Sequence, residues 1–292
     1  CQNNSGPYCA APVNIHRIDW MWANKAVFDS NGISVPTSWD ELNAAAEKLQ
    51  AAGIIPFAHG GQAWQDATVF EAVAMGIGGN NYYKNCYVDL KETCLRSETT
   101  VKVFDQMRKL QGFTDEGSPG RDWNVATGMV IEGKAGFQIM GDWAKGEFTA
   151  AGKVPGVDYY CAATPSNNGY LYNVDSFIFY KTSDPDKQEG QKLLAKLMMG
   201  KNFQKVFNLY KGSIPARLDV PMDEFDKCAK TSNSDIKTAG ASGGLVPSFA
   251  HGMAQGNTMK AALQDVITEH FNSDMSSVDA ANALADSVLD NM

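Results

Sequence analysis

The chain has 292 residues, of which 44% are hydrophobic and 20% are charged, and its formal net charge is -8. This length and apolar share suffice for one large or two moderate cores and exclude a mostly disordered chain. The acidic balance argues against a nucleic-acid partner, because neutralising phosphates requires clustered lysine and arginine. No apolar run approaches the roughly 18–20 residues of a membrane-spanning helix, and no signal peptide remains in this sequence, as expected for the mature part of an exported protein.

Helix signals occur along the whole chain. Ser38 and Glu41 fit a capping box, apolar residues then repeat at helical spacing, and Gly53 stands where a C-terminal glycine belongs. Further helices are expected after Asp184-Pro185, before Gly212, near 258–271 and near 277–290.

Short apolar runs between these helices predict strands. Strands separated by helices of about 10–15 residues indicate an α/β architecture. Two stretches, 165–169 and 238–247, are rich in glycine, serine, asparagine or proline, which is typical of a crossing between domains. The expected strands are 54–58, 135–140, 159–163 and 173–180.

The six cysteines suggest disulfide bonds. Two pairs have short spacings and are interpreted as local bonds, which leaves the remaining two for a long-range bond. The alternatives are six buried reduced thiols or, for the first cysteine, the lipidated residue of a lipoprotein. Disulfides would indicate an oxidising compartment, either the periplasm or the cell surface. The predicted pairs are Cys1–Cys9, Cys86–Cys94 and Cys161–Cys228.

One enzyme motif occurs formally, because residues 240–244 read Gly-Ala-Ser-Gly-Gly. A nucleophile elbow needs a strand before this motif and a helix after it, whereas the preceding segment is polar, so a flexible hinge is the better interpretation. The four histidines lack metal-ligand spacing, and no phosphate-binding loop is present. We therefore expect neither a metal nor a cofactor.

Two tryptophans stand in polar, glycine-bearing stretches rather than in apolar periodic runs. Trp123 lies in Arg-Asp-Trp-Asn and Trp143 in Gly-Asp-Trp-Ala-Lys-Gly. Flat aromatic rings suit the C–H face of a pyranose, while carboxylates, amides and cations suit its hydroxyl edge. The two residues are therefore candidates for lining a sugar-binding cleft, and the alternative is two ordinary core tryptophans.

Six short motifs occur in the order and at the spacing seen in one protein family. The chain resembles the glucose/galactose-binding proteins of bacterial ABC sugar importers, which are extracellular solute-binding proteins with a maltose-binding-protein-like fold. The resemblance covers essentially the whole chain from about Tyr8. The motifs are VNIHR at 13–17, AHGGQ at 58–62, GRDWN at 120–124, GDWAKG at 141–146, KGSIP at 211–215 and AHGM at 250–253.

The resemblance implies a periplasmic binding protein, not an enzyme, that uses no cofactor. Its partners would be a monosaccharide and the membrane subunits of an ABC transporter. The tryptophans would stack on the sugar and the polar residues would bind its hydroxyls, with glutamine and arginine as weaker candidates. The implied ligand-binding residues are Trp123, Trp143, Asp175, Lys211, His251, Gln62 and Arg17.

The resemblance also implies an α/β fold like that of type II periplasmic binding proteins, with two lobes joined by three crossings. Family members carry a long stretch before the point where this sequence begins. We therefore expect one complete lobe, 1–168 with 244–292 returning to it, and an incomplete second lobe, 169–243. A separate N-terminal segment or a second copy of the chain is expected to cover the incomplete lobe.

Two other functions stay open. A secreted glycoside hydrolase would use a carboxylate pair such as Asp122 and Asp142, one on each side of a cleft. A truncated relic or sensory domain would have lost sugar binding together with the missing half.

Overall fold

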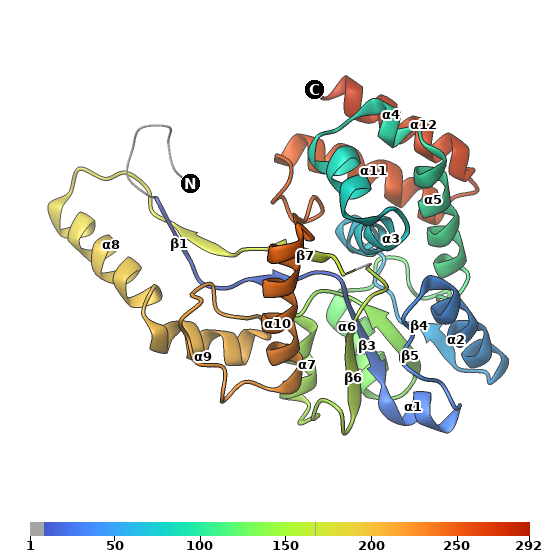
Figure 1. Cartoon of the computed structure of the whole chain (residues 1–292), viewed down its shortest axis with the longest axis horizontal. Coiled ribbons are helices and arrows are strands. Elements are labelled where there is room, and N and C mark those ends of the chain that lie inside the picture. Colours follow the sequence, from blue (N-terminus) through green and yellow to red (C-terminus); the bar gives the residue numbers. More distant parts are fainter. Residues whose placement is uncertain (1–8, 167) are drawn as a thin grey trace.

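The computed structural model describes residues 9–166 and 168–292. A four-stranded sheet, ordered β4-β5-β3-β6, lies at the centre of its larger part (Figure 1). β3 runs antiparallel to both β5 and β6, whereas β4 runs parallel to β5. The strands are β3 (Trp20–Asn24), β4 (Ile55–Phe57), β5 (Ala135–Ile139) and β6 (Tyr159–Ala163).

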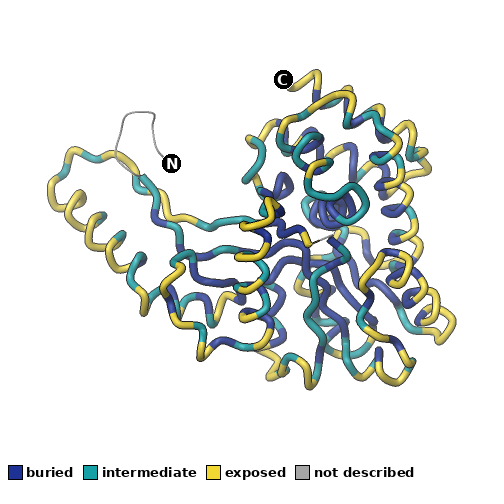
Figure 2. Tube along the Cα trace, viewed as in Figure 1, coloured by how far each residue is buried: buried dark blue, intermediate teal, exposed yellow. Residues whose placement is uncertain are grey.

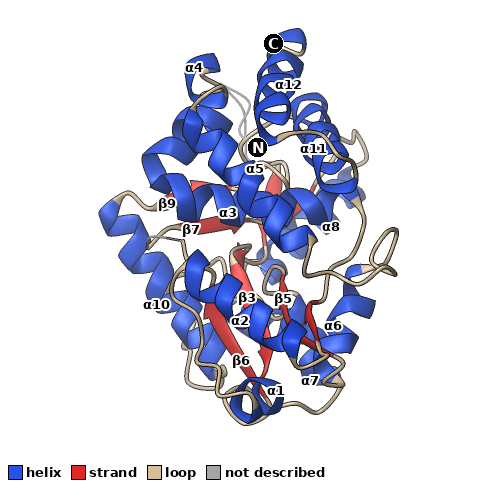
Figure 3. Cartoon of the chain, turned by 90° about the vertical axis from the view of Figure 1, so that its right-hand side faces the viewer, coloured by secondary structure: helices blue, strands red, loops and turns tan. Residues whose placement is uncertain are grey.

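Helices surround this sheet and form a second layer above it (Figures 1 and 3). The helices in contact with the sheet are α1 (Lys25–Ser30), α2 (Trp39–Ala51) and α6 (Trp123–Ile131), and α7 (Ala144–Ala150) packs on α6. The second layer consists of α3 (Ala63–Tyr83), the π-helical turn η1 (Lys84–Val88), α4 (Glu92–Leu95), α5 (Glu98–Gln111), α11 (Asn257–Asn272) and α12 (Ser277–Asp290). Among the described residues, no helix has the length and apolar character needed to cross a membrane.

A three-stranded sheet joins this larger part to the rest of the molecule. Its strands are β2 (His16–Arg17), β7 (Tyr170–Asn173) and β9 (Leu245–Pro247), in the order β2-β7-β9. β7 runs antiparallel to β2 and parallel to β9, so the chain passes through this sheet three times. One further helix, α10 (Lys227–Ser242), packs on β7 and β9.

We call β2, β7 and β9 the crossing strands. Beyond them the chain forms a thin outer region, at the left of Figure 1. It consists of the antiparallel pair β1 (Ala10–Pro12) and β8 (Ser176–Ile178) with the helices α8 (Pro185–Met198) and α9 (Lys201–Lys211). Figure 2 shows that α8 is largely exposed, whereas the elements of the larger part are buried along much of their length.

The capping signals are confirmed where the structure tests them. The Ser38 hydroxyl accepts from the Glu41 amide at 3.1 Å and begins α2. The Asp184 carboxylate accepts from two backbone amides at the start of α8, with Pro185 at the first helical position. Gly212 ends α9 with a left-handed φ of 94°, a conformation that costs glycine little.

One expectation from local composition was wrong, and another holds only for part of its segment. The predicted strand 173–180 is divided between β7 and β8, because these strands pair with β2 and β1 in two different sheets. The predicted break at 238–247 is helical over its first half, since α10 continues to Ser242 and ends at Gly243 with φ 73°, while its second half contains the strand β9. The Ser242 hydroxyl donates to a carbonyl of its own helix, so the Gly-Ala-Ser-Gly-Gly motif forms no nucleophile elbow.

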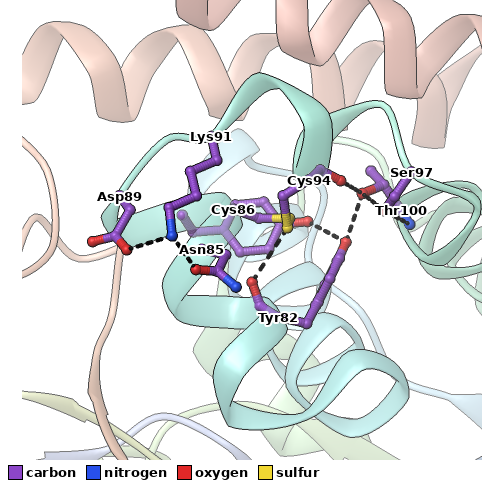
Figure 4. Close-up of a disulfide and its surroundings, with 9 residues drawn as sticks. Tyr82, Asn85, Cys86, Asp89, Lys91, Cys94, Ser97 and Thr100 are labelled. Carbon is purple, nitrogen blue, oxygen red and sulfur yellow. Dashed lines mark hydrogen bonds and ion pairs between the residues drawn. A yellow bond between two sulfur atoms is a disulfide. The ribbon is translucent and has the colours of Figure 1, made fainter.

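Two of the predicted disulfides are confirmed. Cys86–Cys94 links η1 to α4, and the Cys94 sulfur lies 3.6 Å from the Tyr82 carbonyl oxygen (Figure 4). Cys161–Cys228 links β6 to α10. The third predicted pair, Cys1–Cys9, includes Cys1, which lies outside the described residues.

Candidate functional site

A charged cluster lies where the crossing strands leave the larger part. His16, the first residue of β2, contacts an Asp142 oxygen through Nδ1 and an Asp175 oxygen through Nε2, the latter at 3.0 Å. The Asn14 amide group also donates to Asp175, at 2.9 Å. The cluster therefore joins carboxylates from two distant segments through one imidazole ring.

The carboxylates of this cluster control its protonation. Burial by itself lowers the pKa of His16, but the charges and hydrogen bonds of Asp142 and Asp175 outweigh burial and raise that pKa to about 9. Hydrogen bonding from His16 in turn holds the pKa of Asp175 well below its usual range. At neutral pH the cluster consequently holds an imidazolium between two carboxylates.

An aromatic cluster adjoins these charges. The Trp143 ring lies edge-on to His16, with centroids 5.2 Å apart, and edge-on to His251, with centroids 5.0 Å apart. Trp64 lies 6.3 Å from Trp143 and 6.0 Å from His251, measured between ring centroids. Two indoles and two imidazoles are thus packed together, and one of the imidazoles, that of His16, contacts Asp175.

His251 is neutral in this setting. Burial, together with the positive charge of His16, lowers the pKa of His251 to about 3. The Thr68 hydroxyl donates to the Trp64 carbonyl at 2.7 Å, so this hydroxyl accepts from His251 Nε2 at 3.1 Å. This arrangement assigns the ring proton to Nε2 and leaves Nδ1 as a hydrogen-bond acceptor.

Gln62 connects the aromatic cluster to the start of α6. Its amide nitrogen donates to Asp122 at 2.7 Å, while its amide oxygen accepts from the Trp64 indole at 2.8 Å. Trp123 is the first residue of α6 and, like Trp64 and Trp143, is half-buried against one apolar cluster. Gln62 and Trp143 therefore both contact Trp64, and Trp123 packs against the same apolar cluster.

A hollow of about 1010 Å³ opens beside the charged cluster. Asp175, Lys211 and His251 line it together with Phe177 and Phe207. Lys211 Nζ lies 3.9 Å from an Asp175 oxygen, and both side chains are 41% exposed. A hollow of this size, with a few polar groups converging in it, is typical of a small-molecule site.

Arg17 faces away from the hollow, because neighbouring residues of a strand point to opposite faces. Its guanidinium forms ion pairs with Asp19 at 3.2 Å and with Asp235 at 2.6 Å, between the rings of Trp20 and Tyr170. The side chain is almost fully buried. The structure therefore separates Arg17 from Asp175, Lys211 and His251, which line the hollow. Trp143 adjoins this group through His251, whereas Gln62 contacts Trp64, and Trp123 packs against the same apolar cluster as Trp64.

Sequence reasoning missed the parts that Trp64 and His16 play in this arrangement. One signal points to Trp64 without singling it out, because all three tryptophans of the site stand at the beginning of a helix, and so does Trp39, the first residue of α2, outside the site. His16 carried no such signal, since its partners Asp142 and Asp175 lie 126 and 159 residues further along the chain.

The structure does not favour the carboxylate pair of a hydrolase. Asp142 is buried, where it accepts from the Arg17 backbone amide at 3.0 Å and contacts His16. Asp122 is exposed and bound to Gln62. Among the described residues, no group of three or more histidine, cysteine or acidic side chains is arranged to hold a metal ion.

Known proteins resemble this chain over most of its length. Residues 2–198 match the family model of the bacterial extracellular solute-binding proteins. A probable sugar-binding periplasmic protein of Brucella suis is 48% identical over 284 residues, which cover 97% of this chain and 67% of that protein. A protein of the same name from Rhizobium meliloti is 45% identical and is covered to 68%. The chain thus spans about two thirds of the length of these relatives.

Solved structures confirm the expected fold. The bacterial solute receptor AcbH, described as having an exclusive preference for β-D-galactopyranose, has a TM-score of 0.81 at 19% identity, with 99% of this chain and 74% of that chain covered. Maltose-bound MalE3 of T. maritima has a TM-score of 0.76 with the same coverage. These relatives are solute receptors rather than enzymes, as the sequence led us to expect. The chain belongs to the bacterial extracellular solute-binding proteins.

Proposed function

We propose that the chain captures a monosaccharide of the glucose or galactose type in the periplasm and delivers it to the membrane subunits of an ABC transporter. The observation that carries this proposal is the contact of Trp143 with both His16 and His251, directly beside the ionised Asp175. A pyranose needs this combination of an aromatic face and a charged edge. The names of the sugar-binding relatives support the ligand class, and the disulfides suit the periplasm.

Each group has a distinct part in the proposed complex. Trp123 and Trp143 stack on the sugar, Asp175 accepts from its hydroxyls and Lys211 donates to it. His251 offers the acceptor Nδ1. Charge-assisted bonds of this kind contribute about 1.5–3 kcal/mol each where water is excluded. Two predicted residues take supporting parts: Gln62 holds Trp64 in place, and Arg17 stabilises the crossing strands from the other face.

We further propose that the hollow lies between two lobes. Residues 1–168 with 244–292 form the larger lobe, and 169–243 form a remnant of the other. Asp175 and Lys211 come from the remnant, whereas the tryptophans come from the larger lobe, so a sugar bound between them favours hinged closure.

Titration with a panel of monosaccharides that includes D-glucose and D-galactose tests the proposal. Tryptophan fluorescence and calorimetry measure the binding. Replacing Trp143 with alanine is expected to weaken binding by about 1–3 kcal/mol, or roughly 5- to 150-fold in Kd, because one face of the sugar loses its partner. Trp39→Phe is the matched control, because Trp39 belongs to α2 and contacts none of these residues.

Three results would count against the proposal. Unchanged affinity in Trp143→Ala would contradict the stacking role. Binding of no sugar by the parent chain would favour a non-binding relic. Turnover of aryl-glycosides would favour the hydrolase instead.

A further inference from the structure

One fully buried carboxyl group remains unexplained by the proposed site. Glu71 lies in α3 and has no exposed surface. Its Oε1 accepts from the Ser248 hydroxyl at 2.6 Å, and its Oε2 accepts from the Tyr83 hydroxyl at 2.9 Å. Among the described residues, no lysine, arginine or histidine forms an ion pair with it. A buried carboxylate without a cation is costly, so hydrogen bonds must hold it.

Those hydrogen bonds converge on the segment that leads to His251. Glu71 Oε2 also accepts from the backbone amides of Phe249 at 3.1 Å and Ala250 at 3.4 Å. The Ser248 hydroxyl oxygen in turn accepts from the His251 amide at 3.1 Å. One carboxyl group therefore holds, directly or through one hydroxyl, three consecutive backbone amides.

The same segment follows directly on a crossing strand. β9 ends at Pro247, and the Ser248 amide donates to the Tyr172 carbonyl of β7 at 3.0 Å. The chain then turns within four residues to present His251 to Trp143 and to the hollow. A shift of this turn would move His251 relative to both.

We propose that Glu71 is a positioning residue: it fixes the turn Ser248–His251 at the end of β9 and thereby sets where His251 stands in the sugar site. This inference rests on the proposed function. Glu71 touches no ligand itself and acts only through the Ser248 hydroxyl and the backbone of the turn.

The charge of Glu71 matters to this role. Burial raises the pKa of Glu71 to about 7, although the hydrogen bonds that it accepts oppose the shift. As a carboxylate, Glu71 accepts from all four donors. Once protonated it must itself donate, and if the proton is on Oε1 the Ser248 hydroxyl has to turn around. The turn is therefore held more firmly above neutral pH than below it.

The ionisable groups that neighbour Glu71 are not expected to change their protonation between pH 5.5 and pH 8. Burial raises the pKa values of Tyr83 and Tyr87 well above their usual range, and the pKa of His251 is lowered to about 3. Asp19, which acts on Tyr83 electrostatically, is paired with Arg17. All four groups are present in both the parent and a Glu71 variant, so the difference between the two proteins isolates Glu71.

The first test needs no ligand and uses hydrogen exchange of the amides at 249–251 in the whole chain. Near pH 8, these amides are expected to exchange at least about tenfold faster in Glu71→Gln than in the parent. At about pH 5.5, where Glu71 itself is neutral, the two proteins are expected to exchange them at nearly the same rate. Ser248→Ala keeps the carboxylate and is expected to release the His251 amide at both pH values. Glu47→Gln, an exposed position on α2, is the control and should change nothing.

The second test measures Kd for whichever monosaccharide the parent binds. Glu71→Gln is expected to raise Kd about tenfold near pH 8 and less than about twofold near pH 5.5. A fall in thermal stability with unchanged Kd would show a purely structural role and overturn the proposal, as would unchanged exchange at 249–251 in both variants. If Glu71→Gln does not fold, Ser248→Ala decides by the same two measurements. If the parent binds no sugar, the proposed function fails, while the exchange experiment still decides whether Glu71 holds the turn.

Discussion

The larger part of the molecule and its outer region both contain amphipathic helices, but the apolar faces are buried in the larger part and exposed in the outer region. α11 carries an apolar stripe that includes Leu263 and Ile267, and both residues are fully buried. α8 carries an equally regular stripe, yet Leu193 and Leu197 are 60% and 61% exposed. A groove of about 700 Å³ between α8 and α9 is lined mostly by apolar side chains.

This contrast shows what helical periodicity can and cannot tell. An amphipathic pattern indicates which face of a helix needs a partner, because apolar side chains that stay in water contribute no burial free energy to the fold. It does not say that the partner is present. In the larger part, α3 and α5 pack against α11, whereas in the described part of the outer region α8 packs against α9 and β1.

The largest expected effect concerns the disulfide that closes the loop containing α8 and α9. Replacing Cys161 and Cys228 with serine is expected to cost about 4 kcal/mol of unfolding free energy, because the bond closes a long loop in the unfolded chain. The same change at Cys86 and Cys94 should cost only about 2.5 kcal/mol, since their loop is short. Urea unfolding measures both values, and equal losses would contradict the loop-length argument.

A pair of leucine variants tests the contrast directly. Leu263→Ala in α11 is expected to cost about 2–5 kcal/mol, because it leaves a cavity in the core. Leu197→Ala in α8 is expected to change the stability by less than about 0.5 kcal/mol, because most of the side chain is already in water. Comparable losses would mean that α8 is packed in solution after all.

His16 joins the two regions through Asp175, and its contribution should depend on pH. The pKa of His16 is about 9 in the folded state, against 6.5 for a histidine in the unfolded chain. The protonated His16 therefore stabilises the fold fully below about pH 6.5, and this stabilisation is lost as the pH rises through about 9. A shift of this size corresponds to about 3 kcal/mol. Urea unfolding should show that the free energy of unfolding falls more between pH 6 and pH 9.5 for the parent than for His16→Gln. Parallel losses would argue against the charged cluster.

The smallest effect concerns association. We expect the pure 292-residue chain to self-associate through the exposed faces of α8, α9 and β8, because a second copy is the partner available to them. Leu197→Asp should weaken this association by at least about tenfold, whereas Val157→Asp, an equally exposed position in the larger part, should not. Analytical ultracentrifugation decides, and a monomeric parent at all concentrations would refute the expectation.

Local signals predicted helices whose sequences place apolar residues on one face and polar residues on the other. α2, α8, α9, α11 and α12 all begin or end near the expected residues. α3 and β3 were missed because they are buried on more than one face. Every residue of α3 from Gln65 to Met75 is buried, so no apolar stripe stands out from a polar face. Trp20, Met21 and Trp22 of β3 are likewise buried in succession, so the strand shows no alternation.

The candidate site was predictable in its parts but not in its connections. The polar setting of Trp123 and Trp143 and the family motifs pointed to residues that the structure gathers around Trp64 and Asp175. Arg17 belongs to the same motif as His16, yet one step along β2 places it on the other face. Strand facing depends on the register with β7, and that pairing joins residues more than 150 positions apart.

The Cys161–Cys228 bond makes the outer region part of a closed covalent ring. Residues 162–227 include β7, β8, α8 and α9, and their two ends are joined through β6 and the start of α10. A protease that cuts the exposed helix α8 therefore opens the ring without releasing a fragment. The nicked molecule should migrate as one species until the disulfide is reduced, and only then separate into two.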